Sequence, residues 1–481
     1  MSQTVWALVL TSVALFMSGL DNLVVITALP TIRTRFHADL PSLEWTVNAY
    51  TLTFAVLLLT GAALGDRFGR RRIFMCGIAL FTAGSMAAAL ASTSGELIAA
   101  RALQGSGAAA LLPLSLTLLT GAVPAERRAV ALGIWSGING LAVALGPVVG
   151  GFIIQHSTWQ WIFLVNVPVG LLLLPLVRLR LMESHGPNDR LDILGTILAS
   201  AALFSIVYAL VNGNQHGWTS LNVLCGLSGG ALLLTAFLLH ERKHPWPMAP
   251  LRLFSSRTFA TINAVSLLTF LGIFGSIFLL TQYLQGIEGY SPYAAGLRTL
   301  PWTAMPILAA PLGGLAAAKI GAKPVVTTGL VLMATGLAWF ASTLGVHTAY
   351  TTVIAPMALC GIGMSLYFAP LAHLVMSSVP HTDQGMASGV SNAVRELGGV
   401  LGIAILTAVF TAHGNLDTAS HFMHGLTPAL WTGAAAVTTA AFLILLVPHE
   451  PPARRRPLPA GIARREQTGD FGKGSQKMGV S

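Results

Sequence analysis

The sequence predicts an all-α integral membrane protein that crosses the bilayer fourteen times. Only 9% of the 481 residues are charged and 54% are hydrophobic, whereas soluble domains carry about 25% charged residues. Such an apolar excess must face lipid. Apolar runs of roughly 20 residues, the length of helix that spans a bilayer core, also recur along the whole chain.

The apolar runs form two groups of six, separated by a pair. The first six runs are Val5–Leu29, Trp45–Leu64, Ile73–Ala91, Leu97–Val123, Val130–Ile154 and Trp161–Val177. The inserted pair is Leu191–Val211 and Leu221–Leu239. The last six runs are Phe259–Gln282, Ala295–Ala317, Pro324–Leu344, Thr351–Val379, Gly385–Ala412 and Leu426–Val447.

The chain therefore divides into an N-terminal six-helix half, an inserted helix pair with its loop, a C-terminal six-helix half and a tail. Their ranges are 1–184, 185–256, 257–449 and 450–481. The tail is basic, rich in proline and glycine, and without apolar periodicity, so we expect it to be disordered and cytoplasmic.

Basic residues are distributed very unevenly among the connectors. The connectors after even-numbered helices, together with both chain ends, hold 22 Lys and Arg residues, while the odd-numbered connectors hold three. Because cytoplasmic loops carry the positive charge, we expect a multi-pass protein of the bacterial cell membrane with both termini in the cytoplasm. No nucleic-acid partner is expected, since the net charge of +10 is not gathered on one folded surface.

Two pairs of segments repeat at the same offset of 252 residues. GAALGDRFGRRR from Gly61 matches GGLAAAKIGAKP from Gly313. GINGLAVALGPVVGG from Gly137 matches GVSNAVRELGGVLGI from Gly389. A common offset indicates two related halves, and transporters built from parallel repeats rock their halves about a central site.

Several motifs resemble those of one family. DRFGRRR follows the second predicted helix, GPVVGG lies late in the fifth, LDNLVVITALP lies in the first, RALQGSGAA in the fourth, WQWIFLVNVPVG in the sixth, and QYLQGIEGYSPYAAGLRTLP follows the ninth. In this order they resemble the fourteen-helix drug:proton antiporters of the major facilitator superfamily, over nearly the whole chain except the tail. Two glycines of the pattern are replaced by Ala62 and Ala142, which still permit close helix approach.

The resemblance implies export of amphipathic drugs or antibiotics in exchange for protons, and hence antibiotic resistance. Actinomycete members of the family include exporters of a producer's own antibiotics, lincosamides among them. The energy source would be the proton gradient, with no bound cofactor, no enzymatic activity and a monomer as the functional unit. Two alternatives remain: a same-fold transporter of a nutrient, siderophore or lipid, and a non-transporting receptor that signals through the tail.

A proton-coupled carrier needs a carboxylate within its membrane spans, where the low dielectric favours the protonated form. Asp21 and Glu396 are the two acids placed well inside predicted helices. Asp21 lies about 25 Å along the first helix from Thr4 at 1.5 Å per residue, which is a depth similar to that of Arg101. We therefore hypothesise that Arg101 pairs with Asp21 in one state of the transport cycle. The alternative is a fixed structural ion pair.

Arg395 and Glu396 lie side by side in the thirteenth predicted helix. Adjacent helical residues point about 100° apart, so we expect them not to pair and at most one to face the cavity. Glu396 is the second candidate for binding a proton or a cationic substrate, and a polar clamp between helices is the alternative.

The connector DRFGRRR predicts a conformational latch. Gly69 allows a tight turn, and cytoplasmic charge comes from Arg67, Arg70, Arg71 and Arg72. Asp66 is expected to dock on a helix N-terminus or on Arg127 or Arg128, while Thr382 and Asp383 are expected to cap the thirteenth helix. The alternative is that the connector only sets the topology.

The glycine-rich fifth helix and the expected cavity complete the candidate site. The antiporter motif consists of Gly137, Gly146, Pro147, Gly150 and Gly151, whose small residues permit close packing. The resemblance implies that this element seals the two halves during exchange. Adaptable or polar side chains expected to line the cavity are Met17, Trp45, Asn48, Tyr50, Trp135, Asn139, Met305, Tyr367 and Asn392. The histidines fall mostly in connectors, and we expect no metal site.

Overall fold

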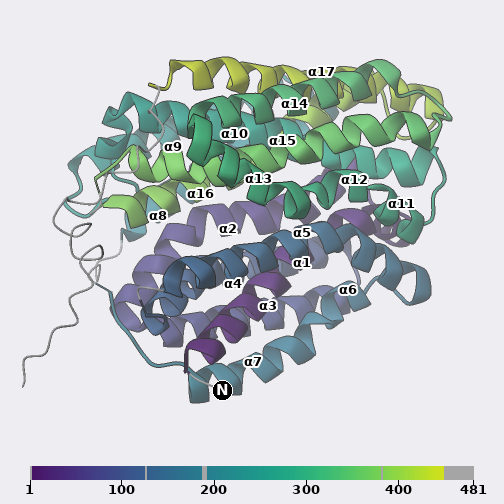
Figure 1. The fold of residues 1–481 in the computed structure, drawn as a ribbon. Coiled ribbons are helices and arrows are strands. Elements are labelled where there is room, and N and C mark those ends of the chain that lie inside the picture. Colours follow the sequence, from purple (N-terminus) through teal and green to yellow (C-terminus); the bar gives the residue numbers. More distant parts are fainter. Residues whose placement is uncertain (1–2, 125–126, 187–191, 381–382, 449–481) are drawn as a thin grey trace, which may run out of the picture.

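The computed structural model describes residues 3–124, 127–186, 192–380 and 383–448, and this part of the chain is helical without strands. The predicted all-α fold is confirmed. Figure 1 shows two groups of long helices lying side by side, the N-terminal group in purple and blue and the C-terminal group in green and yellow. The expected tail 450–481 and Thr382 lie outside the described residues.

The N-terminal half contains six spans, the last of which is built from α6 and α7. Its helices are α1 (Gln3–Phe36), α2 (Leu40–Phe68), α3 (Arg70–Leu90), α4 (Ser94–Ala122), α5 (Arg128–His156), α6 (Trp161–Leu164) and α7 (Asn166–Arg180). The inserted pair is α8 (Ile193–His216) and α9 (Leu221–Lys243).

The C-terminal half begins after a short 3-10 helix and includes a series of shorter helices, α11 to α13. Its helices are α10 (Arg257–Gln282), α11 (Pro292–Arg298), α12 (Leu300–Thr303), α13 (Met305–Ile320), α14 (Ala322–Thr343), α15 (Tyr350–Ser377), α16 (Gln384–His413) and α17 (Ala419–Leu443). A π-helical turn, Tyr283–Ile287, extends α10.

Thirteen helices among the described residues are long and apolar enough to cross a bilayer. The expected span Ala295–Ala317 instead coincides with the series α11, α12 and α13. Pro301 and Pro306 stand in the first turns of α12 and α13, where a missing backbone N–H is tolerated and the preceding helix ends. The count of fourteen spans therefore stays a prediction.

Helix α2 begins earlier than the expected start at Trp45. Asp39 caps it by accepting the backbone N–H of Ser42 at 3.1 Å, so the helix takes in the polar segment before Trp45. Glu44 thereby becomes a third acid inside a span. It is 2% exposed, and its Oε2 has no hydrogen-bond partner among the described residues.

The duplication extends to the backbone conformation. Gly69 joins α2 to α3 with φ 106°, and Gly321 joins α13 to α14 with φ 90°. These two left-handed glycines are separated by the same 252 residues as the aligned segments. Arg71 and Lys323, also 252 residues apart, donate to carbonyl oxygens at the end of each half's last helix: Leu181 at 3.0 Å and Val447 at 2.6 Å.

Replacing Gly69 by alanine should destabilise the protein. Alanine is strained at this φ, and its Cβ would lie 2.7 Å from the carboxyl carbon of Glu183. We expect a loss of about 1–3 kcal/mol, seen as a lower melting temperature in detergent. Gly95→Ala is the control, since a Cβ there meets nothing within 4 Å. Equal melting temperatures for the two variants would contradict this account of the corner.

The inserted pair bridges the two halves on one side of the bundle. Trp45 of α2 lies against Phe204 of α8, with ring centroids 5.3 Å apart. Near the C-terminal end of α8, the amide nitrogen of Asn214 donates to Thr411 Oγ1 of α16 at 2.6 Å. Helix α8 thus contacts α2 of the N-terminal half and α16 of the C-terminal half.

Candidate functional site: a central cavity beside a buried ion pair

A cavity of about 1540 Å³ lies between the two halves. Its walls come from α1, α2, α4 and α5 on one side and from α10, α11, α12, α15 and α16 on the other. Such a volume exceeds the 300–1,000 Å³ of an ordinary ligand pocket. The cavity can therefore hold a bulky organic molecule.

The cavity is open at one end and closed at the other. Gly133 near the start of α5, Gly385 near the start of α16 and Trp246 after α9 all line it and are exposed. At the opposite end the halves touch, and Ser291 Oγ donates to Gln155 Oε1 at 2.8 Å. The access path thus lies at the end of the bundle where α5 and α16 begin.

Asp21 and Arg101 form an ion pair inside the N-terminal half. Their side chains have no exposed surface. Arg101 Nη1 donates to Asp21 Oδ2 and, at 2.9 Å, to Gln104 Oε1. Arg101 Nε donates to the carbonyl oxygen of Thr46 at 3.2 Å. A charge so deeply buried needs such an array of partners.

The second carboxylate oxygen of Asp21 is also occupied. Oδ1 accepts from Asn166 Nδ2 at 2.9 Å and from Gln104 Nε2 at 3.2 Å. Gln104 Nε2 lies 2.7 Å from Ser85 Oγ as well. Sequence reasoning did not identify Gln104, Asn166 and Ser85. Gln104 lies one helical turn after Arg101, and Asn166 lies within an apolar run. Both are polar amides inside predicted spans, and this could have identified them from the sequence.

Tyr50 contacts both this ion pair and the cavity. It lines the cavity, and the guanidinium carbon of Arg101 lies 4.3 Å from its ring centroid. The Tyr50 hydroxyl is 2.9 Å from Ser18 Oγ, which also lines the cavity. A change in the Asp21–Arg101 pair can thus reach the cavity through a single aromatic ring.

Arg395 and Glu396 both line the cavity, and Arg395 Nη2 lies 3.1 Å from Glu396 Oε1. The expectation that these neighbours cannot pair, and that at most one faces the cavity, was wrong. The Cα–Cβ bonds diverge along the helix, but the long arginine side chain brings its guanidinium back to the carboxylate. That guanidinium also lies 5.2 Å from the ring centroid of Phe270.

The DRFGRRR connector is docked onto the segment that follows α7. Asp66 pairs with Arg70, Oδ1 to Nε at 2.9 Å, rather than with Arg127 or Arg128 as expected. This pair is i,i+4 across the corner, and both residues line the open end of the cavity. Arg67 lies over the ring of Phe68, its guanidinium carbon 5.0 Å from the centroid.

Glu183 forms ion pairs with the next two arginines of the connector, Arg71 and Arg72. Its carboxylate lies 3.7 Å from Arg71 Nε and 3.7 Å from Arg72 Nε, and it accepts the backbone N–H of Arg71 at 2.8 Å. In the C-terminal half, Asp383 makes no side-chain cap to α16, contrary to expectation. It pairs with Arg252 at 2.8 Å, so the segment before α10 holds the start of α16.

The glycines of α5 give close packing to two different helices. An added Cβ at Gly146 would meet Leu23 of α1 at 2.7 Å, and one at Gly150 would meet Val24 at 3.0 Å. These two glycines therefore hold α5 against α1 within the N-terminal half.

The other residues of this motif face α11 or the cavity. An added Cβ at Gly151 would collide with the backbone of Pro292, and one at Gly296 with the carbonyl oxygen of Pro147. This reciprocal contact joins the two halves at the closed end. Gly137 meets nothing within 4 Å and lines the cavity.

The structure separates the expected cavity residues into two groups. Those that line the cavity are Tyr50, Trp135, Asn139 and Asn392. Those absent from its lining are Met17, Trp45, Asn48, Met305 and Tyr367. Met17 packs in the core of the N-terminal half, and Trp45 packs on α8. Asn48 and Tyr367 are fully buried between helices.

Two parts of the chain, residues 11–307 and 262–469, match the family model described as Major Facilitator Superfamily. The chain belongs to this superfamily. Its relatives include the multidrug resistance protein Stp of Mycobacterium tuberculosis (strain CDC 1551 / Oshkosh), 37% identical over 84% of this chain and 75% of that protein. The cephamycin export protein CmcT of Amycolatopsis lactamdurans is 35% identical over 95% of this chain and 94% of that protein.

A third relative is the tetracenomycin C resistance and export protein of Streptomyces glaucescens, 34% identical over 82% of this chain and 74% of that protein. Among solved structures, a POT family transporter superposes with a TM-score of 0.68 at 15% identity, covering 92% of this chain and 95% of that one. A D-xylose–proton symporter superposes with a TM-score of 0.65 at 17% identity, covering 91% and 96%. At these identities the two structures show the shared transporter fold alone.

Proposed function

We propose that this protein is a proton-coupled antiporter that exports amphipathic drugs or antibiotics across the bacterial cell membrane and confers resistance to them. It works as a monomer, with both termini in the cytoplasm. In that orientation the end of the bundle where α5 and α16 begin faces the cytoplasm, so the structure represents an inward-open state ready to take up drug from inside the cell.

The proposal rests chiefly on Tyr50, which lines the cavity and contacts Arg101, the partner of Asp21. When Asp21 takes up a proton, its attraction for Arg101 weakens, because a neutral carboxyl group no longer balances the guanidinium charge. The contact of Arg101 with the Tyr50 ring then contributes more to holding the guanidinium, and Tyr50 also lines the cavity that receives the drug. Proton binding and drug binding thereby act on the same side chain, which supplies the coupling that an antiporter needs.

The cavity wall favours an amphipathic substrate. Phe270, Phe274, Trp135 and Trp302 supply apolar contact, while the charges on the wall occur as neighbouring pairs such as Arg395 with Glu396. The names of the relatives, which are multidrug, cephamycin and tetracenomycin exporters, support export rather than nutrient uptake. Expression in a drug-sensitive host tests this: drug accumulation should fall, and a proton ionophore should restore it. Unchanged accumulation across a drug panel would contradict the proposal.

Glu396→Gln should change which substrates are exported. We expect at least a tenfold loss of export for monovalent cationic drugs, because hydrogen bonds and ion pairs to a charged group contribute on the order of 1.5–3 kcal/mol. Export of neutral drugs should be retained. The measurement is a set of initial export rates in vesicles, with Asn392→Ala, one turn away on the same wall, as control. Equal losses for cationic and neutral drugs would remove Glu396 from substrate recognition.

A further inference from the structure

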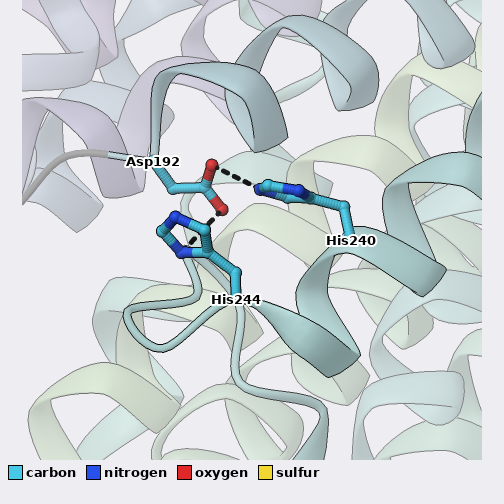
Figure 2. Close-up of side chains that lie close together, drawn as sticks. All are labelled: Asp192, His240 and His244. Carbon is cyan, nitrogen blue, oxygen red and sulfur yellow. Dashed lines mark hydrogen bonds and ion pairs between the residues drawn. The ribbon is translucent and has the colours of Figure 1, made fainter.

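Asp192, His240 and His244 come together beside the mouth of the cavity. Figure 2 shows the carboxylate of Asp192 between the two imidazole rings. His240 belongs to the last turn of α9, His244 follows that helix directly, and Asp192 directly precedes α8. Asp192 itself lines the cavity, as do the neighbouring Pro245 and Met248.

The two histidines have a metal-binding spacing that the sequence analysis overlooked. Residues 240–244 read His-Glu-Arg-Lys-His, which is the HExxH pattern. Residues four apart lie on one face of a helix, so both rings can reach one ion. The expectation of no metal site did not take this pair into account. Asp192 is distant in sequence and comes close to the two histidines only in the folded chain.

The three donor groups are arranged at distances suited to one small cation. His240 Nε2 lies 2.8 Å from Asp192 Oδ1, and His244 Nδ1 lies 3.8 Å from Asp192 Oδ2. One ligand atom from each residue lies within 4.8 Å of the others. Ligand atoms about 2.0–2.2 Å from a tetrahedral zinc ion are roughly 3.3 Å apart. Small side-chain rotations suffice to admit the ion.

The state of Asp192 points independently to a ligand. The residue is 7% exposed. Its Oδ1 accepts the backbone N–H of Gly195 at 2.7 Å, which caps α8. Its Oδ2 has no hydrogen-bond partner among the described residues. A buried carboxylate oxygen without a donor is uncommon, and a cation between it and His244 would satisfy it.

We propose that Asp192, His240 and His244 form a Zn²⁺ site. Two neutral imidazoles and one carboxylate are a donor set that zinc prefers, and the fourth position would hold water. His240 and His244 remain partly exposed, so an ion can enter from the cavity mouth. The ion would tie the end of α9 to the start of α8 at the access path.

One carboxylate oxygen of the HExxH glutamate is engaged outside the site. In metallopeptidases the glutamate of HExxH activates the zinc-bound water. Here Glu241 Oε2 accepts the backbone N–H of Ala249 at 3.1 Å, which engages it with the loop that follows α9. This inference goes beyond the transport cycle and does not depend on it.

Zinc titration of the purified full-length protein, carrying an affinity tag without histidine, tests the site. We expect one tight Zn²⁺ per chain by calorimetry, and Co²⁺ in its place should give the visible absorption of a tetrahedral complex. His240→Ala and Asp192→Asn should each weaken binding at least tenfold. Asn retains the ability to cap α8, so Asp192→Asn separates loss of the ligand from loss of folding.

His413→Ala is the control. This histidine also lies at the C-terminal end of a helix, but its ring is hydrogen-bonded to the carbonyl oxygen of Val409. It should bind zinc like the unmodified protein. Melting curves without zinc establish that each variant is folded. An absence of tight binding in the unmodified protein would overturn the proposal. Folded His240→Ala and Asp192→Asn that bind zinc as tightly as the unmodified protein would also overturn it. That result would place the ion elsewhere, for example at Cys76 or Cys225.

Discussion

Replacing Asp21 by asparagine is expected to abolish drug export against a concentration gradient while leaving downhill drug exchange measurable. Asparagine has nearly the same shape as the protonated acid and can still accept from Asn166, but it cannot release a proton. The variant is thus held in one of the two protonation states between which the cycle alternates. Losing the partner of a buried arginine also costs about 3–5 kcal/mol of stability, so transport rates must be normalised to folded protein.

Reconstituted vesicles with an imposed pH gradient provide the measurement. Unmodified protein should concentrate drug, whereas Asp21→Asn should only equilibrate it. Glu44→Gln is a matched control, since Glu44 is also a buried acid of the N-terminal half but, among the described residues, makes no hydrogen bond or ion pair with the Asp21 network. Glu44→Gln should retain gradient-driven accumulation. If Asp21→Asn concentrates drug as well as the control does, Asp21 has no part in coupling.

Gly151→Ala should produce the second-largest loss of transport. Its new Cβ would collide with the backbone of Pro292 on α11, and close-packed interiors do not absorb such overlaps without moving apart. Because this contact joins the halves at the closed end of the cavity, we expect that end to loosen and the inward-open state to lose stability. Export should fall roughly 5- to 150-fold, the equivalent of an overpacking penalty of about 1–3 kcal/mol.

Accessibility of an engineered cysteine gives a direct readout of this effect. Asn139→Cys, on the cavity wall, should react faster with a membrane-impermeant maleimide from outside the cell when Gly151 is alanine. Both native exposed cysteines, Cys76 and Cys225, are removed beforehand. The control is Gly137→Ala in the same motif, where a Cβ meets nothing within 4 Å. If the two glycines respond alike, the motif does not act through the α5–α11 contact.

The fold could be predicted from sequence because the bilayer imposes a simple rule on helix length and polarity. The rule misplaced helix boundaries where prolines or a capping side chain, rather than hydrophobicity, decide where a helix begins or ends. Pro301 and Pro306 divide one expected span into short helices, and the Asp39 cap carries α2 past its apolar run. The second copy of a left-handed glycine, Gly321, was already implied by the aligned repeat.

The site was less predictable, because contacts between helices depend on rotation about each axis. Equal depth suggested the Asp21–Arg101 pair, yet the amides of Gln104 and Asn166 required the packed structure. Met17 and Tyr367 have residue types suited to a drug cavity but point into packed interfaces. Arg395 and Glu396 showed the limit of reasoning from Cβ directions, since a long side chain can return to its neighbour.

The central claim is that Asp21 exchanges a proton for each cycle of drug movement, and drug-driven proton flux tests it most directly. A pH-sensitive dye is sealed inside vesicles that start without any pH gradient or membrane voltage, and drug is then added on one side. The account predicts that the unmodified protein moves protons opposite to the drug and that Asp21→Asn moves drug without a pH change. A proton flux of equal size in Asp21→Asn, or drug movement by the unmodified protein without any proton flux, would contradict it.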